Sequence, residues 1–226
     1  MNSTDTNSGV LARLLVILKG KATKNVHMRY FFFAVLVYFV GIVIGALFYP
    51  GGFSMAGVNI SYLGGNEENP DGYIYYNAAV FITGLLLTPH FLYLYRRLEW
   101  TPKWVKGTMS LFGMVGTIGF ALVGIYYQGS SAIGHQWATI LAFGGLGIAA
   151  FLHLLIWFLA LLKKKPWPKW KHFLITYLQM FGILALTLIF HGNETLVVNL
   201  GLDEKYAGDR FWEWFYMFAV MGWLID

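Results

Sequence analysis

Six long apolar segments, almost free of charge, divide this chain, and short loops between them hold nearly all of its lysine and arginine residues. About 20 apolar residues suffice for a helix to cross the hydrocarbon core of a bilayer. Only structures that satisfy their own backbone hydrogen bonds survive there. We therefore expect an all-α, polytopic membrane protein, folded as a six-transmembrane-helix bundle. The predicted spans are residues 30–49, 73–95, 107–127, 135–162, 173–190 and 209–225.

The composition excludes an ordinary soluble domain. Hydrophobic residues make up 58% of the chain and charged residues only 12%, whereas soluble domains carry about 25% charged residues. The net charge of +5 does not indicate a nucleic-acid partner, because the basic residues lie in the loops between apolar segments. The chain has no cysteine, so disulfides and thiolate metal sites are excluded.

The loop charges predict the orientation in the membrane. Fourteen of the 16 Lys and Arg residues lie in the N-terminal segment and in the loops after the second and fourth predicted spans. Loops rich in Lys and Arg stay on the cytoplasmic side. We therefore expect both termini inside. The protein would be a multi-pass protein of the cell membrane if its source is prokaryotic.

The chain divides into an N-terminal segment and a transmembrane domain. Residues 1–29 form a cytoplasmic segment in which residues 10–24 combine an apolar core with flanking basic residues. This stretch is too short to span and is typical of an amphipathic helix in the membrane interface. Residues 30–226 form the transmembrane domain.

Small residues recur in the third and fourth predicted spans. Small side chains let helix backbones approach closely in lipid, so we expect these two spans to form the tightest helix pair. The same glycine stripes would suit a homo-oligomer. The residues concerned are Gly113, Gly116, Gly119, Gly124, Ala142, Gly145 and Ala149.

Polar residues near the predicted outer ends of the spans form the first candidate site. Glu213 lies thirteen residues before Asp226, about 20 Å along a helix. It either faces the bundle interior or lies among lipid headgroups near Arg210. If the outer residues converge, they line an outward-facing polar pocket; otherwise they are unrelated interfacial residues. The candidate residues are Glu213, His135, Gln128, Asn77 and His191.

A second candidate set lies toward the cytoplasmic ends of the spans. It comprises His90, His153 and Gln179. Polar groups inside a bilayer need a structural or functional reason, and we weigh interhelical hydrogen bonds against a proton path. Pro89 next to His90 frees backbone carbonyls that need other partners. The spacing of the histidines and acids predicts no metal site, and no cofactor motif is present.

Several short motifs occur in order along the chain. They are Ile60, Ser61, Gly64 and Pro70; Tyr95-Arg96; Leu122-Val123-Gly124; His135; and Glu213-Trp214. With these motifs the chain resembles the damage-regulated autophagy modulator family, whose relatives include a GPI-anchor remodelling factor and a yeast regulator of phosphoinositide signalling. It also resembles prokaryotic six-pass proteins known only as domains of unknown function. The resemblance implies a six-span fold and work on or with lipids. Ala138 and Thr139 depart from the Gly-Ala that the family usually has at the third and fourth positions after the histidine.

Three functional hypotheses follow. The first is a protein that binds or regulates membrane lipids through an outward-facing pocket containing His135 and Glu213. The second is an intramembrane lipid-modifying enzyme, a hydrolase or acyltransferase, with one of these residues as general base. The third is a small-solute or proton-coupled transporter that links the outer and inner polar sets. Membrane lipids are the expected partners in the first two.

Overall fold

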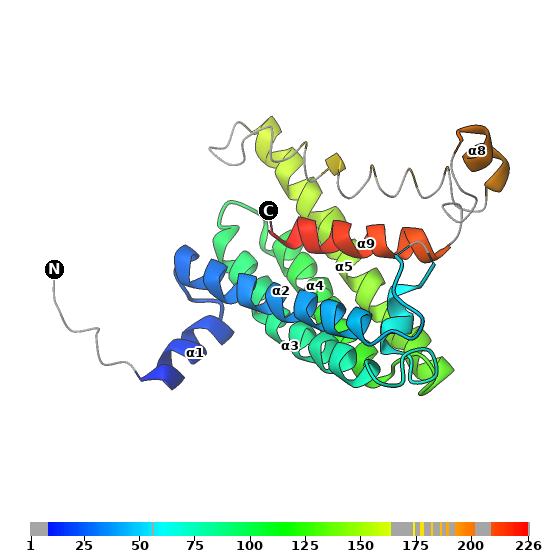
Figure 1. Ribbon diagram of the computed structural model, residues 1–226. Coiled ribbons are helices and arrows are strands. Elements are labelled where there is room, and N and C mark those ends of the chain that lie inside the picture. Colours follow the sequence, from blue (N-terminus) through cyan, green and yellow to red (C-terminus); the bar gives the residue numbers. More distant parts are fainter. Residues whose placement is uncertain are drawn as a thin grey trace.

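The computed structural model describes residues 9–55, 57–163, 174, 177–178, 182, 186, 189, 193–201 and 209–225. Every regular element among these residues is a helix (Figure 1), which confirms the all-α prediction. The elements in chain order are α1 (Val10–Leu18), α2 (Lys24–Leu47), η1 (Ile60–Gly64), α3 (Tyr73–Arg97), α4 (Lys103–Ile125), α5 (Ala132–Leu162), α8 (Glu194–Asn199) and α9 (Asp209–Ile225).

Four helices, α2, α3, α4 and α5, are long and apolar enough to cross a membrane. The chain is therefore an integral, multi-pass membrane protein. The sixth predicted segment forms α9 with the predicted bounds, over 17 residues. The fifth predicted span, residues 173–190, lies outside the described residues apart from isolated positions.

The helices extend beyond their apolar segments. Helix α2 begins at Lys24, six residues before the predicted span, and so includes two basic residues and His27. Basic side chains at a helix end reach water while their stems lie along apolar surface, so they continue the helix without entering the hydrocarbon. Helix α5 begins at Ala132, where the Ser131 hydroxyl accepts a hydrogen bond from the Gly134 amide at 3.2 Å. Such a side-chain cap satisfies one free amide at the helix start.

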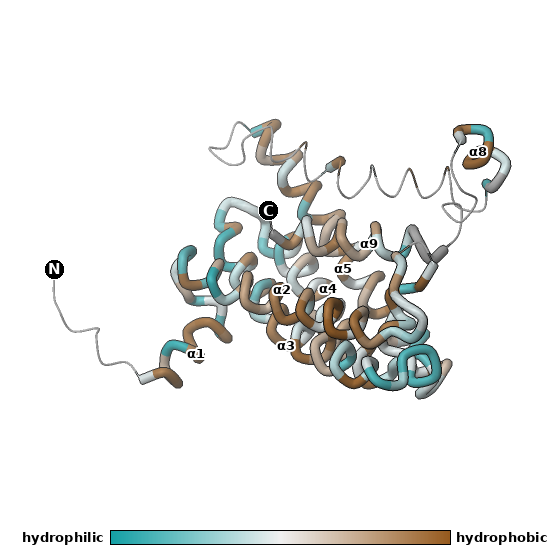
Figure 2. The backbone as a smooth tube through the Cα atoms, in the orientation of Figure 1, coloured by the Kyte–Doolittle hydropathy of each residue, from teal (hydrophilic) through white to brown (hydrophobic). Residues whose placement is uncertain are grey.

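Helix α1 carries an exposed apolar face (Figure 2). Leu11 and Leu18 are 71% and 50% exposed. The segment after α1 is attached to α3, because the Arg96 Nε donates to the Lys19 carbonyl at 2.9 Å. Gly20 has φ +63° and lies against the α3 backbone at Leu92, a position where a side chain would clash. The predicted helix is thus present over residues 10–18 of the 10–24 stretch, because the chain turns at Gly20. Its exposed leucines are suited to the membrane interface.

Helices α4 and α5 pack most extensively of all helix pairs in the described part of the chain. A side chain added at Gly116 would lie 2.6 Å from the Leu146 amide nitrogen, and one at Gly145 would lie 2.6 Å from the Gly116 amide nitrogen. Real Cβ atoms essentially never approach so closely. The prediction that these two spans form the tightest pair is confirmed. Gly116, Gly119 and Gly145 lie at this interface, whereas Gly113 and Gly124 lie against α3.

The loop between α2 and α3 folds over one end of the bundle. Its short helix η1 buries Ile60 and Leu63. The Asn69 side-chain amide donates to the carbonyls of Gly45 and Leu63 at 3.0 and 2.9 Å. The Trp214 indole of α9 donates to the Val58 carbonyl at 2.7 Å. Buried hydrogen bonds therefore join this loop to α2 and α9.

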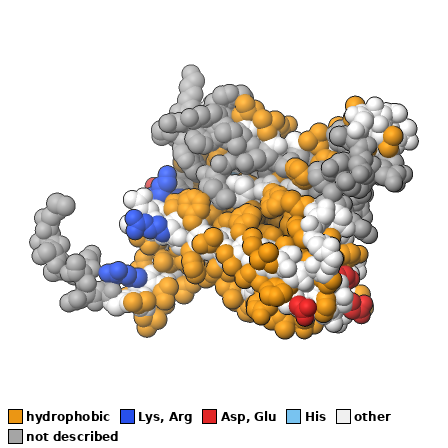
Figure 3. Space-filling view, in the orientation of Figure 1, with side chains coloured by type: hydrophobic (Ala, Val, Ile, Leu, Met, Phe, Trp, Pro, Cys, Tyr) orange, Lys and Arg blue, Asp and Glu red, His pale blue; other side chains and the backbone are white. Residues whose placement is uncertain are grey.

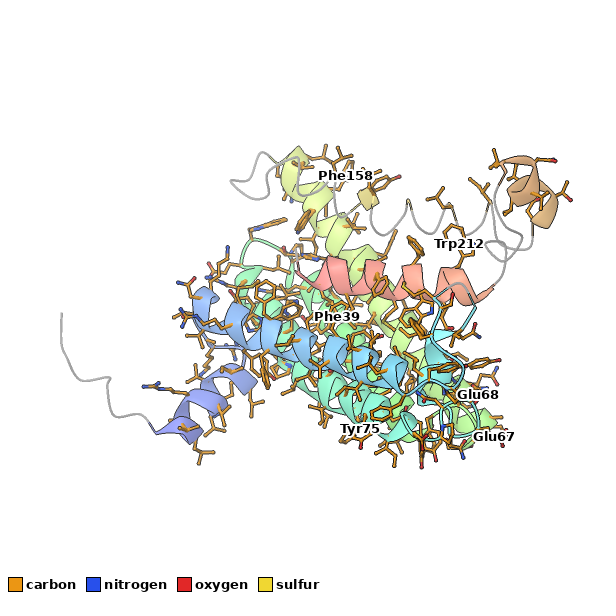
Figure 4. All side chains as sticks on the ribbon, viewed as in Figure 1. Phe39, Glu67, Glu68, Tyr75, Phe158 and Trp212 are labelled. Carbon is orange, nitrogen blue, oxygen red and sulfur yellow. The ribbon has the colours of Figure 1, made fainter. Side chains whose placement is uncertain are left out.

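The two ends of the molecule differ in charge. In the space-filling view, most of the visible acidic side chains gather at the η1 end and the visible basic side chains at the opposite end (Figure 3). Figure 4 labels Glu67 and Glu68 at the acidic end. We refer to these as the acidic end and the basic end.

The α4–α5 interface predicts that alanine substitution lowers the stability of the protein at one of two adjacent glycines and not at the other. Gly145→Ala should lower the free energy of unfolding by roughly 1–3 kcal/mol, the usual cost of overpacking, because its Cβ meets the α4 backbone. Gly144→Ala is the control, because nothing lies within 4 Å of its added Cβ. Thermal unfolding in detergent should separate the two variants. Equal melting temperatures would contradict the close backbone contact.

Candidate functional site

A pocket of about 360 Å³ opens at the basic end between α2, α3, α5 and α9. Ligand pockets in proteins occupy roughly 300–1,000 Å³. Its walls combine imidazole, cationic, aromatic and aliphatic side chains, and none of the described residues lining it is acidic. The polar members are His27, His90, His153, Lys24, Arg97 and Trp223.

One wall is a continuous stack of polar and aromatic side chains from α2 and α3. The His27 Nε2 and His90 Nδ1 atoms are hydrogen-bonded at 3.1 Å. The His27 ring stacks on Tyr93, with centroids 3.7 Å apart and planes within 8°. The Arg97 Nε donates to the Tyr93 hydroxyl at 3.0 Å. The guanidinium is thereby held at the pocket although Arg97 itself is exposed.

The opposite wall pairs α5 with α9. The Trp223 indole Nε1–H donates to His153 Nδ1 at 3.0 Å. An indole nitrogen can only donate, so the His153 Nδ1 must accept. A neutral His153 therefore carries its proton on Nε2. This tautomer follows from the partner and not from any observed hydrogen.

Two nitrogen atoms in these walls have unused hydrogen-bonding capacity. His27 Nδ1 and His153 Nε2 are shielded from solvent and have no hydrogen-bond partner among the described residues. Buried polar atoms of this kind are rare in native proteins and point to a ligand, a water molecule or a functional role. Both belong to side chains that line the pocket.

Pro89 in α3 lies beside His90. A proline inside a helix removes a backbone donor, so nearby carbonyls need other partners. Two side chains serve carbonyls in this turn. The Thr88 hydroxyl donates to the Gly84 carbonyl at 3.1 Å, and the Tyr30 hydroxyl donates to the Leu86 carbonyl at 2.7 Å. The second bond also joins α2 to α3 directly beside the histidine pair.

The structure separates the predicted outer residues. His135 Nδ1 is 2.7 Å from the Tyr126 carbonyl, which can only accept, so this nitrogen donates. His135 and Gln128 line a second pocket of about 550 Å³, formed by the start of α5 and the preceding loop. Asn77 does not line it; its amide donates to the Gly64 carbonyl at 2.8 Å and so holds η1.

Glu213 lies elsewhere on α9 and is partly buried. Its carboxyl interacts electrostatically with Tyr38 of α2 and Tyr76 of α3. Both tyrosines are buried, so the carboxyl lies on the side of α9 that faces these helices. Of the four predicted outer residues that the structure describes, only Gln128 and His135 line one pocket. His191 lies outside the described residues.

The inner set is partly assembled. His90 and His153 line the same pocket, as interhelical partners of His27 and Trp223 respectively, while Gln179 lies outside the described residues. Sequence reasoning missed His27, because it precedes the apolar segment that marked the first span. It could have been sought from His90, Tyr93 and Arg97, whose spacing places them on one helix face.

The described residues contain no group of three His, Asp or Glu side chains arranged to hold a metal ion. The three pocket histidines form hydrogen bonds instead, with one another or with Trp223.

A family model described as a protein of unknown function, DUF998, matches residues 32–225. The chain belongs to the DUF998 family. The match includes most of α2 and all of α3, α4, α5 and α9.

No match was found among curated proteins or solved structures. The family assignment agrees with the resemblance to proteins known only as domains of unknown function. The resemblance to the autophagy modulator family stays a prediction. For this DUF998 protein, function has to be argued from the pocket itself.

The histidine pair predicts energetic coupling. His27→Phe and His90→Phe should each lower the free energy of unfolding by about 1–3 kcal/mol, because each leaves one nitrogen of the remaining imidazole unpaired. The double variant should lose less than the sum, by about 0.5–3 kcal/mol. Thermal unfolding of the four proteins in detergent measures this. The His27→Phe and His135→Phe pair is the control and should be additive; additivity in both pairs would contradict the predicted coupling.

Proposed function

We propose that this protein binds an anionic membrane lipid in the pocket at its basic end. The observation that carries the proposal is the composition of that pocket. Two cationic side chains, Lys24 and Arg97, and three histidines line one cavity between membrane-spanning helices, with no acidic residue among the described lining residues. Such a cavity suits a negatively charged group at the membrane surface.

The remaining walls suit the rest of a lipid. Met28, Leu94 and Leu224 are aliphatic, and Trp100 and Trp157 are aromatic. Indole and phenol rings favour the boundary between headgroups and acyl chains. The headgroup would lie between the cations and imidazoles, and the first carbons of the acyl chains against the aliphatic wall.

We further infer a six-span topology with both termini in the cytoplasm, as the loop charges predict. In that topology the basic end faces the cytoplasm, and the pocket receives lipid from the cytoplasmic leaflet. This leaflet carries the anionic lipids that attract basic residues. As in the expectation from the sequence, the proposed ligand is a membrane lipid. The proposed site, however, lies at the end of the bundle that contains His90, not at the end that contains His135.

The two alternatives make different demands. A transporter needs a polar route between the ends, yet Val80 and Leu87 of α3 are fully buried in the apolar core between Asn77 and His90. An enzyme needs a base beside a water and a scissile bond. The candidate bases are Glu213 and His135. Glu213 interacts electrostatically with Tyr38 and Tyr76, and the His135 Nδ1 is used by the Tyr126 carbonyl. Lipid binding requires neither a polar route nor a base beside a scissile bond, so it is the function that the described geometry supports best.

Neutralising the pocket cations should weaken lipid binding. Each basic residue near the surface contributes about 1 kcal/mol toward an anionic lipid. The double variant Lys24→Gln/Arg97→Gln should therefore bind phosphatidylglycerol roughly thirtyfold more weakly. Native mass spectrometry of detergent-solubilised protein, titrated with phosphatidylglycerol or phosphatidylcholine, measures the effect.

The matched control is Arg29→Gln/Lys103→Gln. It removes the same charge from exposed basic residues at the same end that do not line the pocket. It should retain most of the phosphatidylglycerol binding. Equal losses in both double variants would contradict the pocket and indicate only a general attraction to the basic end. Loss of binding only in His135→Gln would return the site to the other end.

The topology can be tested directly because the chain has no cysteine. Single cysteines at the exposed positions Glu67, Glu99 and Asn199 report the three loops of interest. A membrane-impermeant maleimide applied to intact cells should label Glu67→Cys and Asn199→Cys, and should label Glu99→Cys only after lysis. Labelling of Glu99→Cys from outside would invert the orientation. Protection of Asn199→Cys would contradict six spans.

A further inference from the structure

The wall formed by α5 and α9 contains a buried hydrogen-bond donor, His153 Nε2, whose protonation is set by the Trp223 indole. The Trp223 indole donates a hydrogen bond to His153 Nδ1, which accepts it. The proton of a neutral His153 ring is therefore on Nε2. That nitrogen is buried and without a partner among the described residues. A ligand atom that reaches it must accept a hydrogen bond, which favours an oxyanion oxygen over an ammonium or choline group.

The opposite wall presents a donor and an acceptor together. One proton is shared between His27 Nε2 and His90 Nδ1. In a neutral pair, the outer nitrogen of one ring then carries a proton and the outer nitrogen of the other does not. His27 Nδ1 is one of these outer atoms and is unpartnered among the described residues. The pair therefore has one outer nitrogen that can donate a hydrogen bond and one that can accept.

The charge at the mouth adds to this pattern. Lys24 and Arg97 line the pocket, and no described lining residue is acidic. Arg97 uses its Nε for Tyr93 and lies over the Tyr93 ring at 5.4 Å. Its two terminal nitrogens are not used by that hydrogen bond, so they can contact a ligand. Two positive charges are best matched by two negative ones.

These requirements distinguish the common anionic headgroups. A phosphodiester has two terminal oxygens, one charge and no proton to donate, and a carboxylate is limited in the same way. A phosphomonoester has three terminal oxygens and carries about −1.5 to −2 charge at neutral pH. Its doubly charged form matches the two cations. Its singly protonated form has one negative charge and a P–OH group, which can donate a hydrogen bond to the unprotonated nitrogen of the histidine pair.

We propose that the pocket is a phosphomonoester site, in which His153, the His27–His90 pair, Lys24 and Arg97 hold a terminal phosphate. This inference rests on the proposed lipid binding and narrows it to lipids with a monoester headgroup. The cavity of about 360 Å³ is roughly twelve times the liquid volume of one water. It therefore has room for the phosphate and the adjoining glycerol carbons.

Trp223 is a positioning residue in this site. It does not need to touch the phosphate; it fixes which nitrogen of His153 carries the proton. In Trp223→Phe the ring remains and the donor is lost, so the His153 proton can move to Nδ1 and Nε2 becomes an acceptor that repels an oxyanion. Trp214→Phe is the matched control, because it removes an indole hydrogen bond from the same helix at the acidic end.

The test compares three probes on the full-length protein in detergent: phosphatidic acid, phosphatidylglycerol and glycerol 3-phosphate. We expect wild type to bind phosphatidic acid at least about tenfold more tightly than phosphatidylglycerol. Trp223→Phe should lose about tenfold for phosphatidic acid, the effect of one hydrogen bond to a charged group. Its ¹⁵N spectrum should show the His153 tautomer changing, while Trp214→Phe should keep both the preference and the tautomer.

Each other outcome overturns a defined part of the inference. Equal binding of phosphatidic acid and phosphatidylglycerol by wild type would overturn the monoester preference and leave the lipid function standing. Displacement of phosphatidic acid by an equal concentration of glycerol 3-phosphate would show that the ligand is a soluble phosphate ester. Binding of neither lipid would refute the proposed function itself. These comparisons use wild type, so they do not depend on the folding of Trp223→Phe.

Discussion

Close backbone contact between α4 and α5 is the interaction on which the arrangement of this bundle depends. In lipid, helices gain no hydrophobic energy by associating, so shape and hydrogen bonds must hold them together. Gly116 and Gly145 let the two backbones meet without intervening side chains. Helix α5 has 31 residues, and its position fixes where Ala149, Ala150 and His153 are buried. Helix α9 is then joined to it through Trp223.

Two groups of polar side chains lie at opposite ends of the bundle. Between them, α2 and α3 are joined by the bond from the Thr83 hydroxyl to the Ala34 carbonyl, and Leu87 and Phe91 are buried. At the acidic end, Asn69, Asn77 and Trp214 use their hydrogen bonds to hold the loop in place. At the basic end, the imidazoles of His27 and His153 keep unpartnered nitrogens beside a cavity. The hydrogen bonds at the acidic end hold the loop on the bundle. The imidazole nitrogens at the basic end remain able to hydrogen-bond a ligand.

Helix positions and the tightest helix pair could be predicted from the sequence, because hydropathy and small residues act through local spacing. The α3 start at Tyr73 and the bounds of α9 agree with the predicted segments. Partners of polar side chains could not be predicted in this way. Depth along a helix placed Asn77 and His135 near one end, yet the rotation of each helix directs Asn77 to Gly64 and His135 to Tyr126. His27 was missed because it lies in the polar extension of α2.

The account rests on one claim, that a lipid phosphate lies against the histidines at the basic end. Solid-state NMR can measure it by rotational-echo dephasing between lipid ³¹P and ring ¹⁵N in histidine-labelled protein in phosphatidic acid bilayers. The chain has only six histidines, and a His135→Gln background removes the one at the other pocket. The account predicts dephasing of ring nitrogens that persists in this background, weakens in His153→Phe and disappears when His27, His90 and His153 are all replaced by Phe. Dephasing that is abolished by His135→Gln, or is absent from all ring nitrogens, would contradict it.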